Sequence, residues 1–512
     1  MTLSLACILA ESADRHTDRV ALIEDDTHVT YGQLWLETRA YAAALSRLGV
    51  RPGDRVALLA PNTSDFPRAY YAILTLGAIV VPVHILLTAE EIAYIIEDSE
   101  ATMMIAAGNL LGVGREAAEV AGVPLVSAGP AGVGKAEPSL DRISASVQPV
   151  DRFEPRSPED PAVILYTSGT TGRPKGAVLT HNNLVMNSVV NGADVLRLTP
   201  DDVVLGGLPL SHTFGQTVAM NSTFRAGATL VLQLRFDAGR AIDLMNREQV
   251  NLFYGVPTMY IALLEAAPSR SRLPRLRLCL SGGSALPVSV LEKFNETFET
   301  TICEGYGLSE TSPAATVNQP AQFGTKPGTV GHPLWGVEVE IARAEVDDRI
   351  EFLPTGERGE IVIRGHNVFA GYLNQPAATQ AAIVDGWFRT GDIGAKDKDG
   401  FITILDRKKD LIIRGGFNVY PREVEEVLHR HPAVAQVAVI GIPHATLGEE
   451  VCAVIVPARG TQTPSPEEFI AWCQERLGRH KYPRRLEIVD ELPLGPSLKV
   501  LYRELRQRFS ES

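Results

Sequence analysis

Cysteine, positive charge and long apolar runs are all scarce in this chain. Its 512 residues include five cysteines, and no two of them form a Cys-x-x-Cys pair: they are Cys7, Cys279, Cys303, Cys452 and Cys473. An odd number of scattered cysteines argues against a disulfide framework or a zinc site and fits a reducing compartment. We therefore expect a cytoplasmic protein.

Lysine and arginine together number 48, against 61 aspartates and glutamates, so the formal net charge is -13. Binding to the phosphate backbone of nucleic acid needs a basic surface, so this negative charge disfavours nucleic acid as a bulk electrostatic partner. No run approaches the roughly 18 apolar residues of a membrane span, so we expect no transmembrane segment. Residues 1–19 contain a short apolar stretch with no basic region before it, and they predict a helix, not a signal peptide.

What the chain does contain is a regular alternation of apolar strands and amphipathic helices. Residues 28–62 predict strand, helix and strand, and residues 69–107 repeat the order of helix and strand. Near-continuous apolar strands between helices are typical of a parallel α/β sheet. A stretch rich in Gly, Pro and Ser near residues 127–160 predicts a linker between two α/β halves, after which the alternation resumes.

The predicted secondary structure changes from about residue 324, where strands become short and turns frequent. Asp399-Gly400 predicts a hairpin turn, since Asp-Gly suits the positive dihedral angles there. We expect a β-rich subdomain at about 324–406, a hinge at 407–410 (RKKD) and a C-terminal lid domain at 411–512. The predicted fold class is α/β: an N-terminal region, residues 1–406, of two sheet-bearing α/β subdomains plus the β-rich subdomain, and a small mobile C-terminal α+β domain.

The most unusual stretch is YTSGTTGRPKG, residues 166–176, between two predicted strands. Glycines let the backbone approach a ligand closely, successive N–H groups can form an anion nest, and Lys175 adds a point charge suited to phosphate. A mobile surface loop is the alternative. The stretch is not a Walker loop. GPAGVGKA at 129–136 has that spacing, but it lacks the Ser or Thr for magnesium.

YTSGTTGRPKG resembles the phosphate-loop signature of the adenylate-forming enzyme superfamily: acyl-CoA synthetases, firefly-type luciferases and the adenylation domains of peptide synthetases. The resemblance runs from about residue 10 to the C-terminus, because further stretches follow in the family's order: SGGSALP (281–287), EGYGLSET (304–311), WFRTGDIG (387–394), DRKKD (406–410) and RGGFNVYP (414–421). Around residues 209–221, PLSHTFGQTVAMN is most similar to fatty-acid and other apolar-acid CoA ligases.

The resemblance implies a nucleotide site. Tyr306 would stack on adenine, Ser309 would meet the α-phosphate, and Glu310 would hold Mg2+, a hard cation that prefers oxygen ligands. Asp392 would accept hydrogen bonds from the ribose, with Arg407 beside it. Without the resemblance, Glu310 is an exposed acid and Asp392 a turn residue. The implied ATP- and CoA-binding residues are Thr167, Ser168, Gly169, Thr170, Thr171, Gly172, Lys175, Gly283, Ser284, Glu304, Gly305, Tyr306, Gly307, Ser309, Asp392, Arg407, Gly415 and Gly416.

The same resemblance implies that Lys499, in the C-terminal tail, offsets repulsion between the carboxylate and the α-phosphate during adenylation. The tail departs from the family pattern, because Leu498 stands where Gly is usual and Tyr502 where a basic residue is common. Lys409 stands where the family places its hinge, and a hinge needs only a few residues that absorb dihedral change. The implied catalytic residues are Lys499, His212, Glu310 and Lys409 (as hinge).

His212 is implied to stand at the entrance of an acyl pocket. Its wall is predicted to comprise His212, Phe214, Gly215, Gln216, Met220, Tyr254, Val256, Gly283 and Gly307. Apolar residues there are equally consistent with an ordinary core strand.

The resemblance implies a two-step ligase that uses ATP, Mg2+ and CoA with a fatty or bulky apolar carboxylic acid. An acyl-adenylate and pyrophosphate form first, and acyl-CoA and AMP follow. Three alternatives stay open: an enzyme that loads a carrier protein, a luciferase-like oxygenase and a nucleotide-binding protein without turnover. Homodimers are common among similar proteins. The sequence leaves the identity of the acid open.

Overall fold

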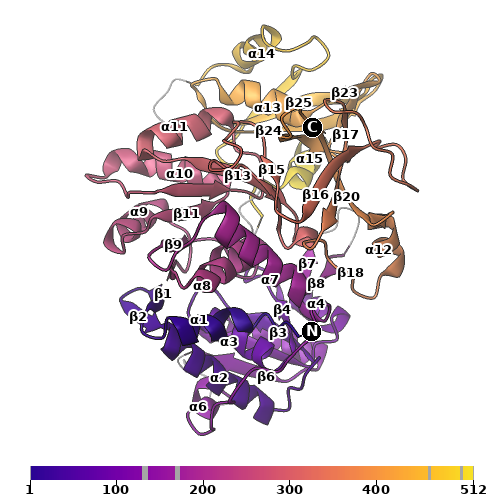
Figure 1. Ribbon diagram of the computed structural model, residues 1–512. Coiled ribbons are helices and arrows are strands. Elements are labelled where there is room, and N and C mark those ends of the chain that lie inside the picture. Colours follow the sequence, from indigo (N-terminus) through magenta and orange to yellow (C-terminus); the bar gives the residue numbers. More distant parts are fainter. Residues whose placement is uncertain (1, 130–136, 168–172, 459–462, 496–499, 511–512) are drawn as a thin grey trace.

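The computed structural model describes residues 2–129, 137–167, 173–458, 463–495 and 500–510. The strands form four sheets. In Figure 1 the C-terminal residues gather at the top, beside residues from the middle of the chain. A large N-terminal region of mixed α/β sheets and a small C-terminal α+β domain confirm the predicted fold class. None of the helices in the described ranges is long and apolar enough to cross a membrane.

The largest sheet has nine strands in the order β15-β14-β13-β12-β11-β9-β10-β1-β2. Its central strands are parallel, whereas β14, β15 and β2 pair antiparallel with their neighbours. The strands are β1 (Val20–Glu24), β2 (Thr27–Thr30), β9 (Val203–Gly206), β10 (Thr229–Leu232), β11 (Leu252–Gly255), β12 (Leu278–Ser281), β13 (Ile302–Gly307), β14 (Ala314–Val317) and β15 (His332–Pro333).

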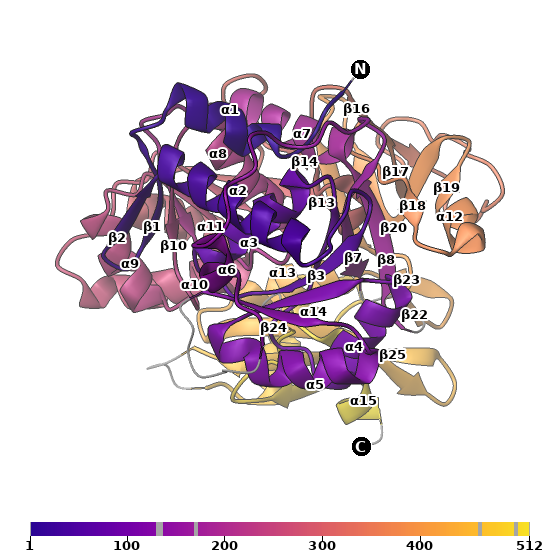
Figure 2. The ribbon, with the colours of Figure 1, turned by 90° about the horizontal axis from the view of Figure 1, so that it is seen from below.

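A second sheet has seven strands in the order β18-β8-β7-β4-β3-β5-β6. The strands are β3 (Arg55–Leu59), β4 (Ile79–Pro82), β5 (Met103–Ala107), β6 (Leu125–Ala128), β7 (Pro161–Thr167), β8 (Lys175–Thr180) and β18 (Gly371–Tyr372). Successive residues of β3 enter different cores: Val56 and Leu58 pack with helices α2 (Tyr31–Arg47) and α3 (Asp65–Thr75), and Ala57 and Leu59 with α4 (Ala89–Asp98) and α5 (Leu111–Ala121). The sheet is therefore covered on both faces, as Figure 2 shows.

The two remaining sheets have five strands each. One contains β16 (Val337–Ala342), β17 (Arg358–Gly365), β19 (Ile383–Val384), β20 (Trp387–Lys396) and β21 (Ile402–Arg407). The expected hairpin joins β20 to β21, with Gly400 at a φ of +87°. The C-terminal sheet contains β22 (Ile412–Arg414), β23 (Phe417–Val419), β24 (Val434–His444), β25 (Gly448–Pro457) and β26 (Arg485–Ile488).

The C-terminal sheet has its own cores, which contain only residues from 412 onward. Alternate residues of β24 face opposite sides: Val437 and Val439 enter one core, Ala438 and Ile440 the other. Helices cover both faces. The other helices of the chain are α1 (Cys7–Arg15), α6 (Leu140–Ser144), α7 (His181–Val190), α8 (Ser222–Ala226), α9 (Ala238–Arg247), α10 (Pro257–Ala266), α11 (Val288–Phe298), α12 (Pro376–Ala382), α13 (Pro421–His429), α14 (Pro466–Gln474) and α15 (Tyr502–Ser510), with short turns of 3-10 or π-helix at η1 (Gly108–Leu110), η2 (Asn191–Val195), η3 (Phe214–Asn221), η4 (Ala267–Ser269) and η5 (Ser309–Thr311).

Residues 127–160 do not separate the two large sheets, which differs from the expected linker between halves. After this segment β7 returns to the sheet that precedes it, where Val163 pairs with Val80 of β4. Conversely, β1 at the start of the chain pairs with β10 in the nine-stranded sheet. Parallel strands are joined by long crossover connections, so strands that are distant in sequence can lie in the same sheet. The order of segments along the chain therefore does not determine which sheet a strand joins.

Candidate active site

The predicted phosphate loop joins two antiparallel strands. Thr167 at the end of β7 pairs with Lys175 at the start of β8, and the Thr167 hydroxyl donates a hydrogen bond to the Lys175 carbonyl at 3.5 Å. Five of the residues implied to bind phosphate lie outside the described residues: Ser168, Gly169, Thr170, Thr171 and Gly172. The two residues that flank this stretch are thus fixed by the strand register.

Lys175 is linked to Glu310 through Tyr372. The Lys175 ammonium lies 5.1 Å from the centre of the Tyr372 ring, within the range of a cation–π interaction. The Tyr372 hydroxyl donates a hydrogen bond to Glu310 Oε1 at 2.9 Å. Burial and the Glu310 carboxylate raise the pKa of Tyr372 far above its usual value, so the hydroxyl stays a donor. Sequence reasoning missed Tyr372, whose only signal is an aromatic residue after Gly371.

Glu310 is buried, not the exposed acid that its residue type alone would suggest. It lies in η5 after β13, next to Ser309, and its backbone carbonyl accepts a hydrogen bond from Phe369 N at 2.9 Å. A buried carboxylate held by Tyr372 fits a hard cation such as Mg2+. No group of three or more His, Cys, Asp or Glu residues within the described ranges could hold a metal by itself.

The residues implied to surround adenine come from two neighbouring parallel strands. Ser281 of β12 pairs with Glu304 of β13, and Gly283 and Ser284 follow in an exposed loop. Glu304 Oε1 accepts a hydrogen bond from Leu286 N in this loop at 3.4 Å, whereas Oε2 is buried with no partner. Burial raises the pKa of Glu304 to about 7. The carboxyl ends of parallel strands commonly carry ligand sites in α/β sheets.

Gly305 and Gly307 lie along β13, on either side of Tyr306. A side chain at position 307 would place its Cβ 1.7 Å from the carbonyl oxygen of Pro313, so only glycine lets β14 fold back this closely. This close approach fixes the turn that carries Ser309 and Glu310.

Tyr306, Asp392 and Arg407 form a linked group. Asp392 on β20 lies directly opposite Arg407 on β21, and Arg407 Nε is 3.4 Å from Asp392 Oδ1. The Tyr306 hydroxyl donates a hydrogen bond to Asp392 Oδ2 at 2.6 Å. Burial raises the pKa of Asp392 above its usual value, while the Arg407 charge and the Tyr306 hydrogen bond act in the opposite direction. The predicted stacking residue, Tyr306, therefore meets the two predicted ribose contacts, although 86 residues separate it from Asp392.

Five of the residues predicted for the acyl pocket line one small cavity: His212, Phe214, Gly215, Val256 and Gly283, joined by Leu208 and Pro209. The backbone N–H of Phe214 donates to His212 Nδ1 at 3.3 Å, which orients the imidazole. Gln216, Met220 and Tyr254 are fully buried and do not line this cavity. Burial raises the pKa of Tyr254, and the charges nearest its hydroxyl are Arg277 and Asp202.

The predicted hinge residue Lys409 lies in a turn after β21. The carbonyl of Arg407 accepts hydrogen bonds from Asp410 N at 3.0 Å and Leu411 N at 3.2 Å across this turn. Desolvation, followed by the charge of Arg407, lowers the pKa of Lys409. Gly415 and Gly416 form the two-residue turn between β22 and β23, with φ angles of +58° and +83° that favour glycine.

The C-terminal tail reaches a core of the C-terminal domain just beyond residue 499. Lys499 itself lies outside the described residues, as does Leu498. Tyr502, the second departure from the family pattern, begins α15, and its hydroxyl donates a hydrogen bond to Glu425 Oε1 of α13 at 3.0 Å. Val439 N donates to the same oxygen at 2.9 Å. Tyr502 therefore joins the tail to α13 and β24 where a basic residue is common in the family.

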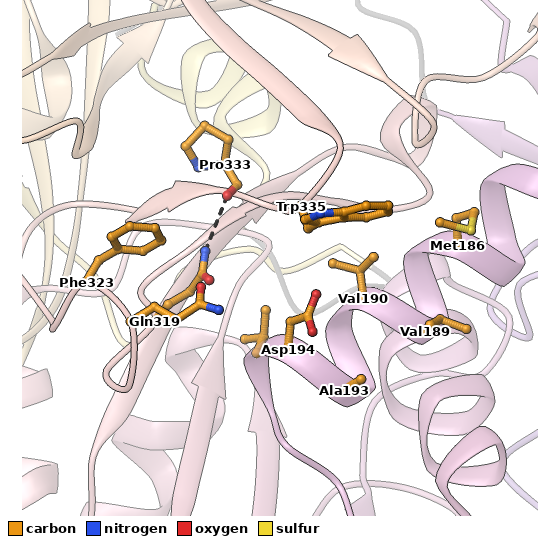
Figure 3. A pocket seen from close by; sticks show the side chains of 11 residues that line it. Met186, Val189, Val190, Ala193, Asp194, Gln319, Phe323, Pro333 and Trp335 are labelled. Carbon is orange, nitrogen blue, oxygen red and sulfur yellow. Dashed lines mark hydrogen bonds between the residues drawn. The ribbon is translucent and has the colours of Figure 1, made fainter.

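A larger open cavity of about 510 Å3 lies elsewhere, between the end of α7 with η2 and the loops around β15. Figure 3 shows Trp335 above Val190 and Asp194, with Phe323 at the other end. None of the predicted site residues lines this cavity. The candidate active site is thus separate from it.

Comparison with known proteins identifies the family of the chain. The family model described as "AMP-binding enzyme" matches residues 9–373, and "AMP-binding enzyme C-terminal domain" matches residues 423–499. These matches cover most of the chain, and the chain belongs to the AMP-binding enzyme family. Its curated relatives are CoA ligases, and it is accordingly an acid–thiol ligase of the AMP-forming type.

Two of these relatives show how the acids differ. The chain is 37% identical to a feruloyl-CoA synthase of Amycolatopsis sp over 94% of each chain. It is 34% identical to a long-chain-fatty-acid–CoA ligase of Bacillus subtilis (strain 168), over 99% of this chain and 95% of the relative. Among solved structures, an anthranilate CoA ligase in complex with anthranoyl-AMP aligns with a TM-score of 0.92 and 28% identity, over 99% of this chain and 97% of that chain.

Proposed function

We propose that the chain activates an apolar carboxylic acid, fatty or bulky, with Mg-ATP and transfers the acyl group to the thiol of CoA. In the first step a carboxylate oxygen attacks the α-phosphorus, and pyrophosphate leaves. In the second step the thiol sulfur attacks the acyl carbon, AMP leaves and the thiol proton passes to solvent. Family relatives named as CoA ligases of feruloyl and long-chain fatty acids support the choice of reaction and leave the acid itself open.

The observation that carries this proposal is the pair of linked groups beside β13. Lys175, Tyr372 and Glu310 form one group at its end, and Tyr306, Asp392 and Arg407 form the other. The first presents a cation and a carboxylate, as a metal-bound triphosphate requires, and the second presents an aromatic face and a carboxylate, as a nucleoside requires. Mg2+ held at Glu310 would neutralise phosphate charge.

Positioning and electrostatics account for most of the expected rate enhancement, since no covalent enzyme intermediate is needed. Lys175 would stabilise charge on the phosphates, and Lys499 would reduce the repulsion between the acid and the α-phosphate. Lys409 would act as the hinge on which the lid domain turns between the two steps, with Gly415 and Gly416 beside the pantetheine arm. Apolar residues around His212 would hold the acid.

A mass-spectrometric assay tests the proposal. Purified protein is incubated with Mg-ATP, CoA and a panel of fatty, aromatic and polycyclic acids, and acyl-AMP and acyl-CoA are followed together. We expect acyl-CoA and AMP in equal amounts from one chemical class of acid. Acyl-AMP that accumulates without thioester would favour a carrier protein as acceptor. ATP binding without either product would leave a nucleotide-binding protein, and oxygen uptake would indicate a luciferase-like oxygenase.

A further inference from the structure

The cavity beside His212 has walls of unusually uniform chemistry. It lies where β9 and β11 end and η3 begins, and the residues that line it are Leu208, Pro209, His212, Phe214, Gly215, Val256 and Gly283. None of these described lining residues is Lys, Arg, Asp or Glu, and His212 is the one ionisable side chain among them. A carboxylate buried here, beyond the one that reacts, would meet no fixed cation among these residues. Burial of an unpaired charge is strongly unfavourable.

The walls also limit how far the cavity can widen. Its free volume is about 10 Å3, room for about one water molecule, so an acid enters only where side chains move aside. One wall is backbone: a Cβ at Gly215 would lie 2.3 Å from the carbonyl oxygen of Pro209, so η3 packs directly on the 208–209 segment. The Phe214 ring lies against Gly282, where a Cβ would be 3.3 Å from Cε1.

The core behind η3 is closed by a hydrogen-bonded pair. The Tyr70 hydroxyl donates to Gln216 Oε1 at 3.3 Å, and Gln216 Nε2 donates to the carbonyl of Leu210 at 3.4 Å. Both side chains are fully buried. Gln216 belongs to η3, so an alkyl chain that displaced η3 would also have to break these hydrogen bonds, which costs free energy each time. Met220, one helical turn further on, is also fully buried.

We propose that the acid is a monocarboxylic acid with a compact apolar body, such as a single ring or a short alkyl chain. This inference rests on the proposed function and narrows it. It excludes dicarboxylic acids because the walls carry no cation for a second carboxylate. It excludes long-chain acids because the wall at Gly215 is backbone packed on residues 208–209, and η3 is hydrogen-bonded to Tyr70 behind it. Val256 and Phe214 are then the side chains that set the length of the acid.

Matched acids separate the two parts of the inference. Hexanoate and adipate have the same length and differ by one carboxylate, as do 4-methylbenzoate and terephthalate, while hexanoate and palmitate differ in length alone. We measure kcat/KM for acyl-CoA formation from each. We expect kcat/KM for each monocarboxylate to exceed that for its diacid by at least about 100-fold, since a second charge would be buried unpaired. Equal rates with adipate, or a preference for palmitate, would overturn the inference.

Binding of the same acids is measured separately by saturation-transfer NMR with AMP present, which needs no turnover. If no acid yields thioester but hexanoate binds and adipate does not, the proposed function fails and the inference about the cavity stands. If adipate or palmitate binds as well as hexanoate, the inference fails whatever the enzyme does. The two failures are therefore distinguishable.

A variant tests the role of Val256. Val256→Ala enlarges the cavity by two methyl groups, and we expect the optimal straight-chain acid to lengthen by one or two carbons, with at least a fivefold gain in the octanoate-to-hexanoate ratio of kcat/KM. Val250→Ala is the matched control: it removes the same atoms from a buried valine that does not line the cavity. An unchanged ratio in Val256→Ala, with melting temperatures of the two variants alike, would contradict the assignment.

Discussion

The hydroxyl of Tyr372 donates a hydrogen bond to Glu310, with 2.9 Å between the two oxygens. The ring of the same tyrosine lies under the ammonium group of Lys175. Tyr372 thus contacts a cation and an anion that come from different sheets. Lys175 begins β8, the strand with which Tyr372 pairs, whereas Glu310 follows β13. Lys175 and Glu310 are therefore linked through one tyrosine.

Tyr372→Phe removes this hydrogen bond and keeps the ring over Lys175. A hydrogen bond to a charged group contributes about 1.5–3 kcal/mol, so we expect kcat for acyl-adenylate formation to fall by about 10-fold. Pyrophosphate release measures this. Tyr41→Phe is the control, because it removes a tyrosine–carboxylate hydrogen bond of 2.8 Å, to Asp141, away from the site. Equal losses of activity in both variants would show that folding, and not Glu310, is affected.

Asp392→Asn should weaken the binding of ATP. The carboxylate accepts from Tyr306 and pairs with Arg407, and an amide would offer one oxygen in place of two. We expect KM for ATP to rise by about 10-fold, with a smaller change in KM for CoA. Glu338→Gln serves as the control, since it breaks an exposed ion pair with Arg364 on the β-rich sheet. A KM for ATP that does not change would remove Asp392 from the nucleotide site.

Lys499→Ala should separate the two half-reactions. If the lysine offsets repulsion between the acid and the α-phosphate, its loss slows adenylation by at least about 100-fold and leaves transfer from supplied acyl-adenylate to CoA nearly unchanged. Pyrophosphate release reports the first step and acyl-CoA formation from synthetic acyl-AMP the second. Equal losses in both steps would contradict this role, and would direct attention to Leu498 and Tyr502.

The stability of the C-terminal domain should fall as the pH rises through about 7. Desolvation raises the pKa of Glu425 to about 7 in the folded chain, above its unfolded value. A raised pKa means that the folded state holds the proton more tightly, so this stabilisation is complete below the unfolded pKa and is lost as the pH passes about 7.

Glu425→Gln tests this directly, because glutamine keeps an oxygen that can accept from Tyr502 and Val439. We expect the variant to match the parent near pH 4.5 and to be more stable at pH 8, by up to about 2 kcal/mol after solvent screening. Urea unfolding at the two pH values gives the difference. Glu475→Gln, at an exposed glutamate, should show no such dependence on pH. If the parent were more stable than Glu425→Gln at pH 8, the prediction would be wrong.

The order of helices and strands could be predicted from sequence, because it depends on local patterns, whereas the candidate site residues came from the resemblance. Apolar strands such as Leu278–Ser281 and the glycine turn at 415–416 are set by neighbouring residues. The resemblance supplied Asp392 and Arg407, and strand register brings them together.

What the sequence did not predict depends on contacts between distant segments. Tyr372 carries no local signal, because its role comes from pairing with β8 and reaching Glu310. The same holds for Gln216, which the resemblance assigned to the pocket wall. In the structure its amide is hydrogen-bonded to Tyr70 and Leu210 in the core. Membership of the sheets was hidden for the same reason, since β1 and β18 join partners far along the chain.

The distance in sequence between paired strands affects how the chain folds during its synthesis. The nine-stranded sheet needs residues from Val20 to Pro333, and the seven-stranded sheet needs residues from Arg55 to Tyr372. During synthesis, neither sheet can acquire its last strand before roughly two-thirds of the polypeptide has left the ribosome. Until then, β8 and β14 present unpaired edges, which are sites of aggregation. The cores of the C-terminal domain contain only residues from 412 onward, so this domain is under no such constraint and is synthesised last.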